Sequence, residues 1–185
     1  MQLRHSHVIL DTCCILNFCA SGHFLDILKS IPAIVTVSDV VKTQELLTLK
    51  RVEGGESEGP SQFEQAIAKN LLTVVDFESD AEMETFIYYT AEMGDDGESA
   101  TSAIAFHRNW AIATDDKKAI KVLQKEAPLI QIVTTPDIIK HWSETTSLKA
   151  AELRKALQSI RITGKYMPPR QHPLLQWWQQ TMSAE

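Results

Sequence analysis

The sequence predicts an α/β protein: a three-layer sandwich in which a five-stranded parallel sheet is flanked by helices, with a C-terminal helical extension. Short apolar segments alternate along the chain with longer segments of helical periodicity. The short segments are apolar throughout, which is typical of strands buried on both faces of a parallel sheet. The 185 residues, 44% of them hydrophobic, suffice for one substantial core. We expect one domain over residues 1–146 and a C-terminal helix and extended tail, 147–185, packed on it.

The strands are predicted from apolar composition and from the turn residues around them. They cover residues 7–10, 31–37, 71–75, 110–114 and 129–134. A helical pattern separates each strand from the next, so right-handed crossovers are expected to place helices on both faces of the sheet.

The helices are predicted from periodicity and from capping residues at their starts. The expected caps are Ser38, Asp96 and Thr135, with capping boxes at Ser61-x-x-Glu64 and Ser79-x-x-Glu82. The expected helices cover residues 13–18, 24–28, 39–51, 61–69, 80–93, 97–106, 116–125, 135–142 and 147–161.

Acidic residues follow the strands or begin the helices of this pattern. Asp11 follows the first strand, and Asp115 and Asp116 follow the fourth. Glu98 lies in the first turn of the acidic helix, and Glu45 shares a face with apolar neighbours on the helix after the second strand. In open α/β sheets, ligands bind beyond the carboxyl ends of the strands, where the strand order reverses. We expect all five carboxylates to converge there, although helix capping by itself also explains acidic residues at a helix start.

A group of carboxylates without soft ligands favours Mg²⁺ or Mn²⁺ as the cofactor. Such an ion, completed by substrate phosphate, suits metal-assisted hydrolysis of a phosphodiester. Cys13, Cys14 and Cys19 are crowded into one apolar segment without matching His or Cys spacing elsewhere. They are interpreted as buried, reduced thiols, and neither a zinc site nor a disulfide framework is expected.

Four acidic motifs together resemble those of the PIN domain family, over roughly residues 6–140. The motifs are Val8-Ile-Leu-Asp11-Thr-Cys-Cys-Ile-Leu-Asn17, Val37-Ser-Asp-Val-Val-Lys-Thr-Gln-Glu45-Leu, Gly94-Asp-Asp-Gly-Glu98-Ser-Ala and Ala113-Thr-Asp-Asp116-Lys-Lys-Ala. The resemblance implies a metal-dependent endoribonuclease, similar to the toxin-type members of the family.

Carried over by position, the resemblance makes Asp11, Glu45, Glu98 and Asp116 the metal-binding and catalytic acids. It makes Asp115 an auxiliary acid, supported by the hydroxyl of Thr114 or Thr12. It also implies an RNA substrate, a homodimer and an antitoxin as a protein partner. A different hypothesis remains beside it: a PIN-like scaffold that keeps the acids but acts as a regulatory module, binding nucleic acid or protein without nuclease activity.

The net charge of −6 is unevenly distributed along the chain. Six of the eighteen lysines and arginines lie between residues 149 and 172, together with a single acid, Glu152. This basic segment is predicted to contact substrate phosphates or a partner. Trp177 and Trp178 behind it are predicted to anchor the tail, although an exposed indole could also stack on a base. No membrane segment or export signal is expected, and a cytoplasmic location follows from that.

Overall fold

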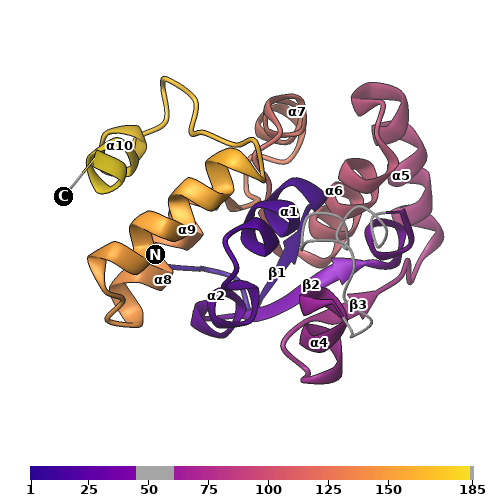
Figure 1. Ribbon diagram of the computed structural model, residues 1–185. Coiled ribbons are helices and arrows are strands. Elements are labelled where there is room, and N and C mark those ends of the chain that lie inside the picture. Colours follow the sequence, from indigo (N-terminus) through magenta and orange to yellow (C-terminus); the bar gives the residue numbers. More distant parts are fainter. Residues whose placement is uncertain (45–60, 184–185) are drawn as a thin grey trace.

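The computed structural model describes residues 1–44 and 61–183, and its centre is a sheet of five parallel strands (Figure 1). The strand order is β3-β2-β1-β4-β5. The strands are β1 (His7–Leu10), β2 (Ile34–Ser38), β3 (Thr73–Val75), β4 (Ala111–Ala113) and β5 (Ile132–Val133). This arrangement confirms the predicted α/β fold with an all-parallel sheet.

Helices follow the strands in the predicted alternation. They are α1 (Thr12–Ala20), α2 (Phe24–Ser30), α4 (Gln62–Ala68), α5 (Asp80–Met93), α6 (Asp96–Arg108), α7 (Lys117–Glu126), α8 (Thr135–Thr145), α9 (Ala150–Ile162) and α10 (Leu175–Ser183). A further helical segment begins at Asp39, directly after β2, and is described as far as Gln44. The Ser38 hydroxyl accepts the Val41 N–H at 3.2 Å, so Ser38 caps this segment as predicted.

The central strands β1 and β4 bury both of their faces. Val8 and Leu10 pack into the core under α1, α2, α4, α8 and α9, whereas Ile9 between them packs against α6 and α7. Helix α5 covers the outer side of α6 and α7 through Tyr89 and Met93. The two helical layers lie on opposite sides of the sheet in Figure 1. Since successive side chains point to opposite faces, strands covered on both sides are mostly apolar. Buried Thr36 of β2 is polar, and its hydroxyl donates to the Val8 carbonyl.

The strand order reverses between β1 and β4. The chain builds β1, β2 and β3 in one direction, then returns to pair β4 with the free side of β1. Leu10 is in register with Ala113, and the Asp11 N–H donates to the Ala113 carbonyl at 2.9 Å. The residues that follow β1 and β4 therefore lie side by side, at the position where this class of fold binds ligands.

The C-terminal extension belongs to the same core. Ala156, Leu157 and Ile160 of α9 are fully buried with the side chains of α1 and α8. Trp178 of α10 is also fully buried, and its ring meets that of Tyr166 edge-on at 6.0 Å. The buried indole agrees with an anchoring role and leaves Trp178 no face for a nucleic-acid base.

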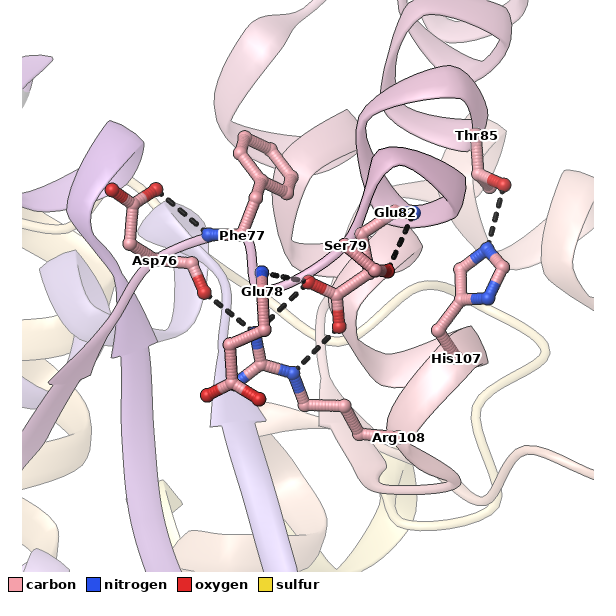
Figure 2. Close-up of polar contacts among 8 residues, drawn as sticks. All are labelled: Asp76, Phe77, Glu78, Ser79, Glu82, Thr85, His107 and Arg108. Atoms are coloured by element: carbon pink, nitrogen blue, oxygen red, sulfur yellow. Dashed lines mark hydrogen bonds and ion pairs between the residues drawn. The ribbon is translucent and has the colours of Figure 1, made fainter.

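A buried arginine ties α6 to the segment between β3 and α5 (Figure 2). Arg108 Nε donates to Glu82 Oε1 at 2.7 Å, and its terminal nitrogens donate to Glu78 Oε1 and the Asp76 carbonyl. The Arg108 and Glu82 side chains are 10% and 3% exposed. The guanidinium also lies 5.1 Å from the centre of the Trp110 ring. This network fixes α6 against α5 at the end of α6 remote from Glu98.

Several element ends differ from the expectation for local reasons. Strand β2 begins at Ile34, because the Ile31 N–H closes the end of α2 on the Leu28 carbonyl. Strand β5 begins at Ile132, because the Ile130 N–H closes a turn on the Ala127 carbonyl. The residues expected to be extended at both places instead end the preceding helix or form a turn.

Three predicted caps also need correction. Asp95, not Asp96, caps α6, and Thr134, not Thr135, caps α8. At the start of α5, Ser79 accepts the Glu82 N–H, but the Glu82 carboxylate accepts from Glu78 and Arg108. The tail is not extended throughout, because residues 175–183 form α10. Of the helices described, none has the length and apolar composition needed to span a membrane.

Candidate functional site at the carboxyl edge of the sheet

Three carboxylates at this edge are held by the backbone of helix starts. Asp11 Oδ1 accepts the Thr12 N–H at 2.8 Å at the start of α1. Asp95 Oδ1 accepts the Glu98 N–H at 2.9 Å at the start of α6, and Asp116 Oδ1 accepts two N–H groups at the start of α7. The N-termini of three helices thus lie at this edge of the sheet, and their dipoles favour negative charge there.

Asp11 is buried at the carboxyl end of β1, with 1% of its surface exposed. Its Oδ2 accepts the Thr114 hydroxyl at 2.8 Å and the Cys13 thiol at 3.1 Å. Burial raises the pKa of Asp11 to about 6, although these hydrogen bonds lower it and the charge of Asp95 adds to it. Asp11 is therefore held in one orientation at the centre of the site.

The pKa of Glu98 is strongly raised by its surroundings. Burial, followed by the charges of Asp11, Asp116 and Asp95, raises its pKa to about 8, and Lys118 partly opposes the shift. Within residues 1–44 and 61–183, no group donates a hydrogen bond to its carboxylate. Glu98 thus faces three negative charges, which disfavour its own charged form.

Gly97 lies where the first turn of α6 passes close to the first turn of α1. A Cβ on buried Gly97 would lie 3.3 Å from Asp95 Oδ1 and 3.5 Å from Thr12 Oγ1. The first turn of α6 therefore sits against the first turn of α1, which brings Glu98 toward Asp11. Asp11 and Asp116 lie close enough to Glu98 for their charges to act on it, but among the described residues the oxygens of these three acids do not all lie within 4.8 Å of one another. Glu45 lies outside the described residues.

Asp115 uses its carboxylate differently from its neighbour Asp116. Its Oδ1 accepts the Thr135 N–H at 3.0 Å and the Tyr166 hydroxyl at 2.8 Å. Its Oδ2 accepts the Asn17 amide at 3.1 Å and the Thr135 hydroxyl. Burial raises the pKa of Asp115 against the effect of these donors, and burial also raises the pKa of Tyr166. Asp115 therefore joins α1, α8 and the segment after α9.

Two adjacent cysteines lie against Asp11 and Asp115. Cys14 is buried and Cys13 is half-buried, and neither forms a disulfide. The sulfur atoms of Cys13 and Cys14 and a carboxylate oxygen of Asp115 lie within 4.8 Å of one another, so this group could hold a metal ion. The sequence predicts reduced thiols there and no zinc site, so the metal-binding capacity of this group is not predicted by the sequence.

Several residues around the site were not identified from the sequence. Tyr166 and Thr135 hold Asp115, and the Lys118 ammonium donates to the Met93 carbonyl at 2.8 Å beside Glu98. Asn17 stood in the first motif but had no assigned role. Asn17 lies three residues after Cys14 and so shares its face of the helix, which was the signal available for it.

Comparison with known proteins adds no relative: no family model, no curated protein and no solved structure matches the chain. What the fold and the site define is a class, a parallel α/β protein with clustered carboxylates at the point where its strand order reverses.

Proposed function

We propose that the protein is a metal-dependent endoribonuclease of the PIN-domain type. In this proposal Asp11, Glu98 and Asp116 hold Mg²⁺ or Mn²⁺, with Glu45 as a further ligand from outside the described residues. The observation that carries it is the placement of three carboxylates where the strand order reverses. Asp11 and Asp116 are fixed at the starts of α1 and α7, and Glu98 lies close enough for their charges to raise its pKa. Repulsion of this kind destabilises the protein unless a cation offsets it.

The donors present fit a hard divalent ion. Asp11, Glu98 and Asp116 offer oxygen alone, and oxygen is what Mg²⁺ and Mn²⁺ prefer. The charge of Lys118 lowers the pKa of Glu98 but only partly offsets the carboxylates. The Lys118 side chain is exposed, and its ammonium donates to the Met93 carbonyl. A bound ion would supply Lewis-acid activation of water and charge neutralisation at a phosphate.

The chain's own residues would orient the reacting groups. Thr114 and Cys13 hold the Asp11 carboxylate from one side, and the backbone of α7 holds Asp116. These contacts fix the two carboxylates before any substrate arrives, which lowers the entropy that binding must remove.

Exposed positive charge lies beside Asp115 and Asp116 and suits an RNA backbone. Lys117 and Lys118 are exposed at the start of α7. Lys165 is exposed next to Tyr166, whose hydroxyl contacts Asp115. Lys155 and Arg161 on α9 are exposed too, and no described carboxylate forms an ion pair with any of these side chains. They are available to neutralise substrate phosphates.

A regulatory module that binds nucleic acid or protein without cleaving it is the second candidate. It is favoured by the capping bonds of Asp11 and Asp116, since each carboxylate already has a structural role. In either case we propose a homodimer, supported by exposed apolar side chains on the outer layer, Ile87 and Tyr88 among them. Light scattering at tens of micromolar that reports the single-chain mass of 20.8 kDa would contradict the dimer.

Cleavage of a labelled single-stranded RNA in Mg²⁺ or Mn²⁺, with EDTA as the blank, tests the nuclease. Asp116→Asn keeps a good helix cap while removing the charge. It should lower the rate at least about tenfold. Asp96→Asn, an exposed acid on the same turn as Glu98, is the matched control and should cleave normally. Cleavage that persists in EDTA would refute the proposal, and metal binding without cleavage would favour the regulatory module.

A further inference from the structure

In the proposed nuclease, Cys13 only orients Asp11 and Cys14 has no role, yet the two thiols and Asp115 form a group that could hold a metal ion. We propose that Cys13, Cys14 and Asp115 form a separate binding site for a thiophilic divalent ion of the Zn²⁺ class. The proposal does not depend on the nuclease function.

The geometry supports three protein ligands. The Cys14 thiol points to Asp115 Oδ2 at 3.6 Å, and Cys13 Sγ accepts the Asp115 N–H at 3.2 Å. Both sulfur atoms therefore already face the residue that supplies the third ligand. The mutual spacing within 4.8 Å suits an ion bound at its ordinary distances of about 2.0 to 2.3 Å after small shifts.

The surroundings would hold these ligands in place. Asn17 and Thr135 donate to Asp115, and the Thr135 hydroxyl also contacts Cys14 Sγ at 3.6 Å. Donors of this kind around a ligating carboxylate orient it, as they do in established metal sites. Cys13 and Asp115 keep partial exposure, which gives an ion a path to the group and leaves a fourth position for water.

The ligand chemistry separates this site from the carboxylate cluster. Sulfur ligands select Zn²⁺ and similar ions over Mg²⁺, which requires oxygen. On binding, each thiol releases its proton to solvent, so two thiolates and one carboxylate meet one divalent charge. Millimolar Mg²⁺ would therefore occupy the Glu98 cluster and leave the thiols to the softer ion.

Co²⁺ distinguishes the two sites, because sulfur ligands give an intense near-ultraviolet charge-transfer band that oxygen ligands do not. The full chain, kept reduced and supplied with excess Mg²⁺, should bind one Co²⁺ with this band and lose it when Zn²⁺ is added. Cys13→Ser, at a half-buried position, should weaken binding at least about tenfold. Cys19→Ser alters a buried cysteine on the same helix outside the group and is the matched control.

Cys14→Ser should act like Cys13→Ser, and Glu98→Gln should leave the band unchanged. A Co²⁺ complex of the folded wild-type protein without the sulfur band would overturn the proposal. Equal Co²⁺ affinity in Cys13→Ser and wild type would overturn it as well. Neither result depends on RNA cleavage, so failure of the nuclease proposal leaves this test intact.

Discussion

Replacing Glu98 by glutamine should stabilise the metal-free protein at alkaline pH. In the folded state the pKa of Glu98 is raised from 4.5 to about 8, first by burial and then by Asp11, Asp116 and Asp95. Between these two values the folded protein holds a proton that the unfolded chain has released. Stability is therefore lost as pH rises through this window, and it is fully retained below it. Glutamine carries no such proton, so the variant should lack this component of the pH dependence.

The magnitude follows from the size of the shift. An unscreened shift from 4.5 to about 8 corresponds to about 5 kcal/mol of stability lost above pH 8. Glu98 is only half-buried, and solvent screening reduces this figure, so we expect about 2 kcal/mol. For a chain of this size, that difference raises Tm by about 4 to 8 °C.

Urea unfolding in EDTA at pH 5 and pH 8.5, followed by the fluorescence of buried Trp142 and Trp178, measures the effect. The variant should gain most of its advantage at the higher pH. Asp96→Asn removes an exposed charge from the same turn and should show a much smaller difference. Adding Mg²⁺ at pH 8.5 should stabilise the wild type more than the glutamine variant. A difference in stability that is equal at both pH values would refute the reasoning.

The other predictions concern stability. Arg108→Met leaves the Glu82 carboxylate buried without its partner and should cost about 3 kcal/mol in urea unfolding, with part of the loss recovered in the Arg108→Met, Glu82→Met double variant. Tyr166→Phe removes one donor to Asp115 and should lower the free energy of unfolding by about 1 to 2 kcal/mol. The decrease should be smaller in an Asp115→Asn background, and fully additive decreases would contradict the contact. Deleting residues 149–185 exposes the core under α9 and α10 and should abolish cooperative unfolding in circular dichroism; a folded fragment would show the extension to be dispensable.

Local sequence patterns predicted the parts of the site that local structure creates. The apolar segment before Asp11 predicts a strand that stops at Leu10, and β1 ends there. Glu98 lies in the first turn of its helix because an acidic turn with two glycines precedes it. The cap moved by one residue, from Asp96 to Asp95, since either side chain can accept an N–H and only backbone geometry decides between them.

Long-range contacts decided what the sequence could not. Asp115 and Asp116 are adjacent carboxylates after one strand, and nothing local distinguishes them. Their roles separate because Thr135 and Tyr166, 20 and 51 residues further along, donate to Asp115 and leave Asp116 to cap α7. The amphipathic pattern of α9 was visible in the sequence, but its helical continuation at residues 175–183 was not.

Thr114 explains why the carboxylate cluster and the thiol group occur together. Its hydroxyl is fully buried between β1 and β4, donates to Asp11 Oδ2 at 2.8 Å and accepts the Asp116 N–H at 3.1 Å. The same oxygen lies 3.7 Å from Cys13 Sγ. Since a hydroxyl has one hydrogen, the proton given to Asp11 leaves a lone pair of Thr114 for the Asp116 N–H. One side chain at the reversal of strand order thus orients an acid of the proposed Mg²⁺ site and contacts a sulfur of the proposed Zn²⁺ site, so an ion at either group would alter the electrostatic surroundings of the other.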